Sequence, residues 1–167
     1  MSQNNDTHFS ITRVFDAPLE LVWKAYSEAE RLAQWWGPKN FPTKVVSLDF
    51  RPGGMFHYSM ETPGGVMYGK FIYREIVSLE RIVFVISFAD AEANTVRAPF
   101  DPNWPLENLS SVTFEEVEGG KTRLILDGDV LNGTEAEIEA YKKGMKGMVA
   151  GTNGTLDQLV EYLATVA

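Results

Sequence analysis

Side chains that could carry out acid–base or metal chemistry are few and scattered in this sequence. There is no cysteine, and the two histidines, His8 and His57, lack the spacing of metal ligands. Glu61, Glu75 and Asp127 lie near the ends of predicted strands and could act as acid or base, although carboxylates are far more often solvated. No nucleophile elbow, phosphate-binding loop or dinucleotide-binding glycine pattern occurs. We therefore assign no catalytic residue, no metal site and no cofactor, and expect no bound zinc.

Two polar residues fall on faces that are otherwise apolar. Arg13 shares strand parity with Phe9, Ile11 and Phe15. Either a carboxylate or phosphate pairs with it, or its aliphatic stem is covered while its charged end reaches water. Thr152 lies within the apolar stripe of a C-terminal helix. Its hydroxyl either bonds the carbonyl one turn back or faces a cavity that is not fully dry.

Aromatic and methionine side chains are plentiful on the predicted strands. Phe56, Tyr58 and Met60 alternate on one of them, so His57 is predicted to face solvent. Each such residue alone suits an ordinary core. However, a sheet that curves around a helix leaves space at its open end, and Met with Tyr suits the lining of such a space. The candidate ligand-binding residues are Trp35, Phe56, Tyr58, Met60, Phe71, Tyr73, Phe84, Trp104, Met145, Met148 and Thr152.

The elements that must position these residues follow from periodicity and turn signals. A strand is predicted over 8–15, then a short helix opening at Pro18. A capping box at Ser27–Glu30 predicts a second short helix that ends near Trp36-Gly37-Pro38. Tight turns between the later strands favour an antiparallel sheet, including a hairpin at Glu118–Gly120. The six later strands are predicted over 44–50, 54–61, 66–77, 81–88, 110–117 and 121–128.

The clearest prediction is a helix from the capping box at Thr134–Glu137 to about Leu163. Thirty residues at ~1.5 Å each span roughly 45 Å, enough to cross the sheet. Four glycines share another face of this helix, and either a close backbone approach compensates for them or they leave this stretch soft enough to admit a ligand. The glycines are Gly144, Gly147, Gly151 and Gly154, and the apolar stripe contains Ile138, Tyr141, Met145, Met148, Val149, Leu156, Leu159 and Leu163.

Composition narrows the class of protein. The 167 residues suit one domain, which we place at 1–167 with residues 1–7 disordered. We expect an α+β fold in which a curved antiparallel sheet wraps around the long C-terminal helix, with two short helices after the first strand.

A net charge of −8 argues against nucleic acid and anionic membranes as partners. No apolar run approaches the ~20 residues of a membrane span, so we expect no membrane insertion and a cytoplasmic location.

Several short motifs occur in a specific order along almost the whole chain, namely Arg13–Pro18 with Leu21–Trp23, Trp35–Pro38, Arg51–Gly54, Arg97–Phe100 with Trp104–Glu107, Val112–Glu116 and Gly154–Leu159. Their combination resembles the homologues of the activator of the 90-kDa heat-shock protein ATPase, and the motifs between 97 and 107 resemble one bacterial branch. The resemblance implies the helix-grip fold of the START and birch-pollen-allergen superfamily. It also implies a cavity that commonly takes lipids, sterols or polyketides in ligand binders, aromatases and cyclases.

Two departures from the family matter. The namesake cochaperone carries a separate chaperone-binding N-terminal domain, which we do not expect here. The family often has tryptophan where this chain has Thr152. Our first hypothesis is therefore binding of a small hydrophobic or aromatic molecule. The alternatives are a cyclase or hydrolase using the same cavity and a stress-linked or chaperone-associated protein contact. The sequence leaves homodimer formation open.

Overall fold

The computed structural model describes residues 7–37, 41 and 43–166. Within them the predicted α+β architecture is confirmed: one antiparallel sheet, a long C-terminal helix and two short helices after the first strand. Most of the segment predicted to be disordered, 1–7, lies outside the described residues, as does Pro38. Thr7 is described, and its buried side chain donates a hydrogen bond to Asp129.

The element boundaries lie within about three residues of the predicted ones. The helices are α1 (Leu19–Ser27), α2 (Ala29–Trp35) and α3 (Glu135–Val166). The strands are β1 (Phe9–Phe15), β2 (Thr43–Leu48), β3 (Met55–Thr62), β4 (Gly65–Val77), β5 (Arg81–Ala89), β6 (Asn108–Val117) and β7 (Lys121–Val130). The predicted β6–β7 hairpin turns through Gly119 and Gly120, both at positive φ, a backbone conformation that favours glycine.

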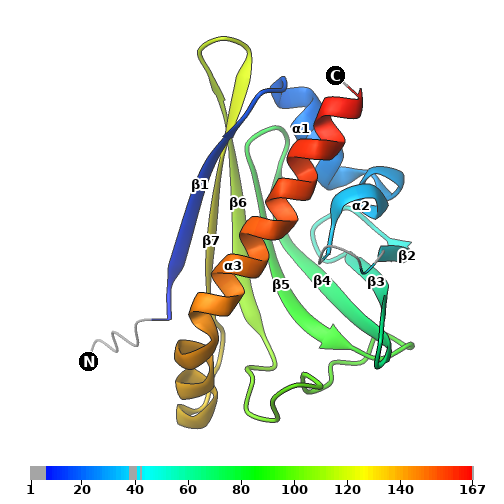
Figure 1. The fold of residues 1–167 in the computed structure, drawn as a ribbon, viewed down its shortest axis with the longest axis vertical. Helices are drawn as coiled ribbons and strands as arrows, with labels where there is room; N and C mark the ends of the chain where they lie inside the picture. Colours follow the sequence, from blue (N-terminus) through cyan, green and yellow to red (C-terminus); the bar gives the residue numbers. More distant parts are fainter. Residues whose placement is uncertain (1–6, 38–40, 42, 167) are drawn as a thin grey trace.

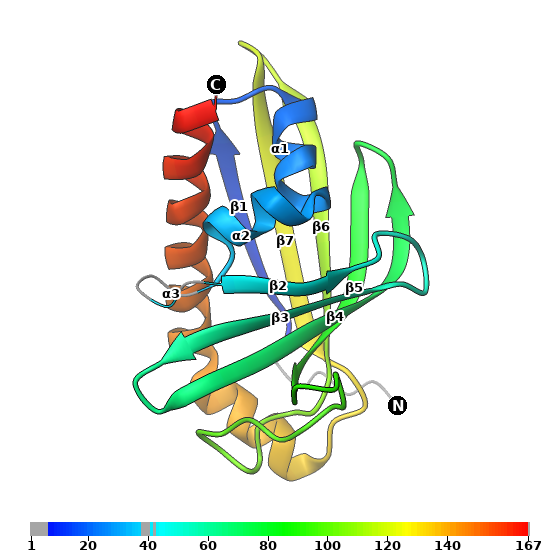
Figure 2. The ribbon, with the colours of Figure 1, turned by 90° about the vertical axis from the view of Figure 1, so that its right-hand side faces the viewer.

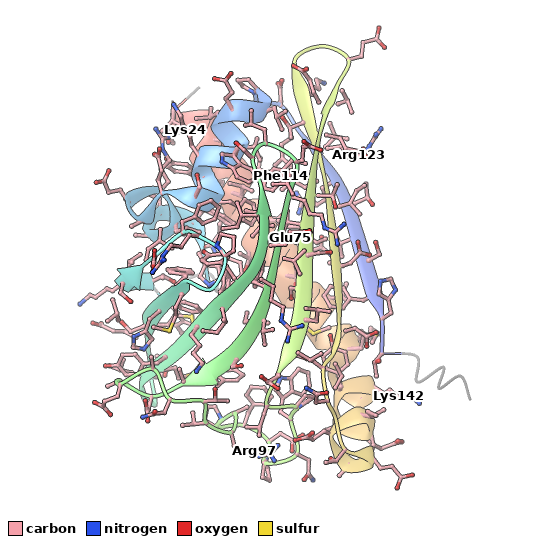
Figure 3. All side chains as sticks on the ribbon, turned by 180° about the vertical axis from the view of Figure 1, so that it is seen from behind. Lys24, Glu75, Arg97, Phe114, Arg123 and Lys142 are labelled. Carbon is pink, nitrogen blue, oxygen red and sulfur yellow. The ribbon has the colours of Figure 1, made fainter. Side chains whose placement is uncertain are left out.

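The seven strands form one antiparallel sheet in the order β1-β7-β6-β5-β4-β3-β2. Register shifts interrupt the β2–β3 pairing between Val45 and Ser47 and the β4–β5 pairing between Tyr73 and Glu75. Such irregularities bend strands and increase their twist. The sheet curves so far that β2, β3 and β4 run across the direction of β1, β6 and β7 (Figures 1 and 2). The side away from α3 carries charged residues such as Glu75 and Arg123 (Figure 3).

Helix α3 lies along the concave face of the sheet (Figure 1). The predicted capping box is present, because Thr134 N–H donates to Glu137 Oε1 at 2.9 Å and Glu137 N–H donates to Thr134 Oγ1 at 3.2 Å. Towards its C-terminal end, α3 buries Leu156, Leu159 and Leu163. None of the helices in the described part of the chain combines the length and apolar character needed to span a membrane.

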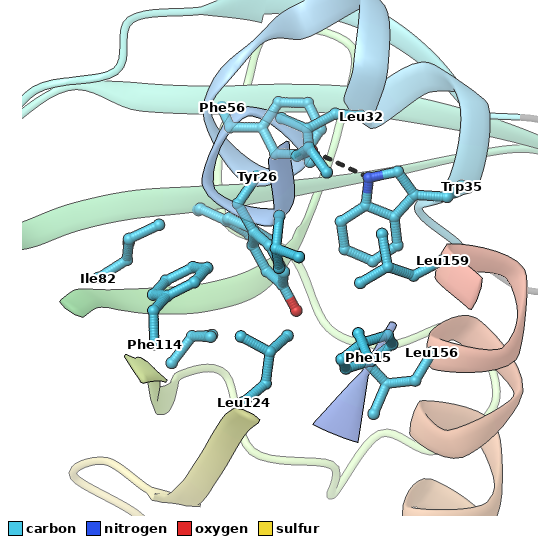
Figure 4. Packing of buried hydrophobic residues seen from close by; sticks show 14 of the residues in the cluster. Phe15, Tyr26, Leu32, Trp35, Phe56, Ile82, Phe114, Leu124, Leu156 and Leu159 are labelled. Atoms are coloured by element: carbon cyan, nitrogen blue, oxygen red, sulfur yellow. Dashed lines mark hydrogen bonds between the residues drawn. The ribbon is translucent and has the colours of Figure 1, made fainter. Parts of the chain in front are cut away.

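The main core lies between the sheet, the two short helices and the C-terminal half of α3 (Figure 4). Trp35 is fully buried there, and its indole N–H donates to the Ala25 carbonyl at 2.9 Å. Tyr26 packs edge-on against Trp35 and Phe114, with ring centroids 4.8 and 5.4 Å apart. This aromatic packing fixes α1 and α2 over one end of the sheet.

Two local predictions are wrong. His57 is only 3% exposed, because the turn after β5 covers that side of β3 and its Asp90 carbonyl lies 3.0 Å from His57 Nε2. The predicted capping box at Ser27 does not form. Glu28 occupies the N-cap of α2 without a side-chain cap, and its carboxylate accepts a hydrogen bond from Arg31 at 2.6 Å.

Candidate ligand-binding cavity

A cavity of about 720 Å³ lies between the concave face of the sheet and α3. Every strand except β2 contributes to its lining, together with α1, α3 and the 90–107 segment. Most of the lining residues are apolar or glycine. Cavities of roughly 300–1,000 Å³ with this character are typical of sites that enclose small organic ligands.

The structure brings together six of the eleven predicted site residues. Those that line the cavity are Tyr58, Met60, Phe84, Trp104, Met148 and Thr152. The other five lie outside the lining: Trp35, Phe56, Phe71, Tyr73 and Met145. The first four of these are buried core residues. Among them, Phe71 stacks on the lining residue Phe84, with ring centroids 4.1 Å apart. Met145 is partly buried on α3 without bordering the cavity.

Two glycine–aromatic pairs shape the floor of the cavity. Phe9 pairs directly with Gly128 across β1 and β7, and Tyr58 pairs with Gly69 across β3 and β4. A Cβ atom on Gly128 would lie 2.2 Å from the Phe9 ring, and one on Gly69 would lie 2.5 Å from the Tyr58 ring. Each ring therefore lies down over the neighbouring strand instead of standing up into the cavity. Glycine inside a strand is the sequence signal for such an approach.

The four glycines of α3 all border the cavity. A Cβ on Gly147, Gly151 or Gly154 would meet no described atom within 4 Å, so the first of the two alternatives, close approach of another backbone, does not apply to these three. Gly144 differs, because the Trp104 ring lies where its Cβ would be, at 2.7 Å. The glycine face therefore leaves space open, except where Trp104 packs on it.

Thr152 takes the first of its two predicted alternatives and also borders the cavity. Its hydroxyl donates to the Met148 carbonyl one turn back at 2.9 Å, and the residue also lines the cavity. The hydroxyl is thus satisfied within the helix, and the position does not require a polar ligand group.

The 90–107 segment lies near the start of α3 (Figure 2), and its Phe100 and Trp104 side chains line the cavity. Trp104 packs on Tyr141 with ring centroids 5.2 Å apart, and Phe100 packs on Trp104 at 5.5 Å. Arg97 ties the segment to α3 through an ion pair with Glu137, which is only 5% exposed. Burial alone would raise the pKa of Glu137, but hydrogen bonds from Thr134 and the ion pair with Arg97 outweigh burial and lower it.

Tyrosine hydroxyls supply much of the polarity in this apolar surface. Burial raises the pKa of Tyr58 to about 12, and a hydrogen bond from Trp36 offsets part of the shift. Burial also raises the pKa values of Tyr26 and Tyr141, so these side chains stay neutral at ordinary pH. The lining further includes Asn108 and Ser110 on β6, which sequence reasoning missed. Their alternation with buried Val112 would have placed them on the concave face.

The remaining candidates for chemistry do not converge. Glu61 pairs with Lys44 at 3.3 Å and Glu75 with Arg81 at 3.2 Å, both at the surface, and Asp127 contacts His8 at 3.1 Å. Within the described ranges, no group of three His, Asp or Glu side chains could hold a metal ion.

Arg13 takes the first of its two predicted alternatives. It forms an ion pair with Asp157 of α3 at 2.9 Å and donates to the Asn153 carbonyl at 3.2 Å. It therefore joins β1 to α3.

The sheet, the long helix and the two short helices define a helix-grip-like α+β fold. Protein Ms6760 from Mycobacterium smegmatis has a crystal structure similar to it, with 27% identity, a TM-score of 0.79, and coverage of 99% of this chain and 97% of that one. The solution structure of a protein from Arthrobacter aurescens is 25% identical, with a TM-score of 0.79 over 98% and 90% of the two chains. Protein NE0264 from Nitrosomonas europaea, 21% identical with a TM-score of 0.75 over 100% of each chain, shares the fold.

The family model described as Activator of Hsp90 ATPase homolog 1-like protein matches residues 16–164. The chain therefore belongs to this family, which confirms the resemblance seen in its motifs. Among curated proteins, none matches the chain significantly.

Proposed function

We propose that the protein binds a small apolar or aromatic molecule in the cavity between α3 and the sheet. The observation that carries this proposal is the cavity itself, about 720 Å³ in volume and bordered mainly by apolar side chains. Random packing defects in a domain are rarely larger than a water molecule. A space of this size, kept open by glycines on α3 and in the sheet, supports a binding role.

The test uses Thr152→Trp, which places a large ring over the middle of the cavity. Thr152 lines the space and forms its hydrogen bond within α3, so we expect the variant to fold. A neutral fluorescent probe, N-phenyl-1-naphthylamine, should bind the wild-type protein, and Thr152→Trp should weaken its binding at least about tenfold, roughly 1.4 kcal/mol. Fluorescence titration measures the affinity.

Ala150→Trp is the matched control, because Ala150 is exposed on α3 and does not border the cavity. It adds the same ring to the same helix and should leave probe binding unchanged. Thr152→Leu repeats the test with a smaller side chain, and thermal unfolding confirms that each variant is folded. Failure of the probe to bind the wild-type protein, or equal binding by Thr152→Trp and Ala150→Trp, would contradict the proposal.

A further inference from the structure

Two buried side-chain atoms lack a hydrogen-bond partner within the described part of the chain. They are the hydroxyl oxygen of Tyr26 and the Oδ1 atom of Asn108. Both residues line the cavity. Native proteins seldom leave buried polar atoms unpaired, since such atoms lose their hydrogen bonds to water without replacement. Their common location suggests that the missing partners belong to the ligand.

Tyr26 cannot easily turn to find another partner. The side chain is 4% exposed, and its ring is held between Trp35 and Phe114. Figure 4 shows its hydroxyl directed away from α1, toward the space between Leu124 and Leu156. Leu156 also lines the cavity, so the hydroxyl is directed toward a side chain of the cavity wall. Because burial raises its pKa, the hydroxyl stays protonated and able to donate.

Asn108 lies toward the other end of the cavity. It begins β6 and shares a strand face with Ser110, Val112 and Phe114. Phe114 packs on Tyr26 and is six residues further along, which corresponds to about 20 Å at ~3.3 Å per residue. The two unpaired polar atoms are therefore associated with opposite ends of β6, with a mainly apolar surface between them.

Charge on the lining narrows the ligand further. Asp127 is the single charged residue among the described lining residues, so no arginine, lysine or histidine among them could balance an anionic ligand.

We propose that the ligand is a neutral, oxygen-bearing apolar molecule, such as a hydroxyketone, whose carbonyl oxygen accepts a hydrogen bond from the Tyr26 hydroxyl. The Oδ1 atom of Asn108 can only accept, so it takes a hydrogen bond from a hydroxyl group near the other end of the ligand. This inference rests on the proposed binding function and specifies the chemical class of the ligand. It distinguishes such molecules from plain hydrocarbons and from fatty-acid anions.

The test compares fluorene with 9-fluorenone, which have the same three-ring framework and differ by one carbonyl group. Equilibrium dialysis measures the binding of both to the wild-type protein, Tyr26→Phe and Tyr73→Phe. Tyr26→Phe should lower the affinity for fluorenone about fivefold, as expected for one hydrogen bond, and leave that for fluorene unchanged. Tyr73→Phe is the matched control, because it makes the same change at a buried tyrosine that does not border the cavity. It should leave the ratio of the two affinities unchanged.

The outcomes separate this inference from the proposed function. If both compounds bind but Tyr26→Phe keeps the wild-type ratio, the inference is overturned and the binding function stands. If neither compound binds, both are overturned. Fluorene-9-carboxylate should bind more weakly than fluorenone, and tighter binding would overturn the assignment of a neutral ligand. Tyr26→Phe loses no protein hydrogen bond among the described residues, so unfolding measurements should show a variant as stable as the wild type.

Discussion

The two glycine–aromatic pairs of the sheet set the width of the cavity floor. The rings of Phe9 and Tyr58 lie over Gly128 and Gly69, where any Cβ would be closer than 3 Å to ring atoms. If either glycine were replaced by a residue with a side chain, the aromatic ring above it would have to move off the neighbouring strand and into the cavity. These positions therefore couple local packing to the volume available for a ligand.

Gly128→Ala should destabilise the protein by about 1–3 kcal/mol, the usual cost of overpacking. Its Cβ would lie 2.2 Å from Phe9 Cε1. Urea unfolding measures the change, and Gly64→Ala is the control, since its Cβ would meet its nearest neighbour, Thr62 Oγ1, at 3.9 Å. Combining Gly128→Ala with Phe9→Leu should recover part of the loss. Strictly additive effects of the two changes would show that the ring contact is not the cause.

Residue type predicted an apolar site but could not delimit it. Tyr58, Met60 and Phe84 border the cavity, whereas Phe56, Phe71 and Tyr73 have the same chemistry and lie in the core. Which buried residue borders a void depends on distances between elements far apart in the sequence. The strand period likewise gave the side of the sheet on which His57 lies, but not the turn that covers it.

Helix α3 contributes both to the packed core and to the wall of the cavity. Its C-terminal half buries leucines in the core, while the stretch from Gly144 to Gly154 borders the cavity. Glycine in a helix interior is less favourable than alanine because it has more conformational freedom to lose. The glycines thus weaken the helix where they keep the cavity open.

Gly147→Ala and Gly151→Ala should each raise the free energy of unfolding by about 0.5–1 kcal/mol. Neither new methyl group would meet a described atom within 4 Å. Gly144→Ala is the contrasting variant, because its Cβ would lie 2.7 Å from Trp104 Cζ3 and the clash should cancel the gain. Chemical unfolding compares the three. Equal stabilisation by all of them would mean that Trp104 does not pack on α3 as described.

Of the two predicted capping boxes, one forms and the other does not, and the difference has a physical reason. The box at Thr134 forms both of its reciprocal hydrogen bonds, but the same residue pattern at Ser27 forms neither. Only one residue, Glu28, separates α1 from α2, and it adopts the extended N-cap conformation in place of Ser27, the last residue of α1. A short connection between two helices overrides the local preference.

The molecule has two contrasting parts. The core is closely packed beneath α1 and α2, whereas the cavity lies beneath the middle of α3. Periodicity, turn signals and the ordered motifs were enough to predict this fold. They could not give the volume of the cavity, because it is a small difference between the space that the sheet encloses and the volume of the side chains that fill it. The bulges at Val45/Ser47 and Tyr73/Glu75 that accompany the curvature also left no distinctive sequence signal.

Buried tyrosines in the core and in the cavity wall should make the stability of the protein fall at alkaline pH. Burial raises the pKa of Tyr58 to about 12, and it raises those of Tyr26, Tyr73 and Tyr141 as well. A tyrosine in the unfolded chain has a pKa of about 10. Below pH 10 both states hold these protons, so the stabilising contribution is fully present. Above pH 10 the unfolded state releases them first, and stability falls as the pH rises toward the folded pKa values.

Tyr58→Phe isolates one of these contributions. Between pH 10 and 12 one such tyrosine accounts for a slope of about 1.4 kcal/mol per pH unit, so the variant should lose stability less steeply than the wild-type protein by about that amount. Urea unfolding at several pH values from 8 to 11.5 measures the slopes. The difference between the two proteins at pH 8–9 serves as the baseline, because it contains the loss of the Trp36 hydrogen bond and no titration of Tyr58. A constant difference across the whole range would show that Tyr58 ionises equally readily in the folded and unfolded states, and therefore that its hydroxyl is open to water.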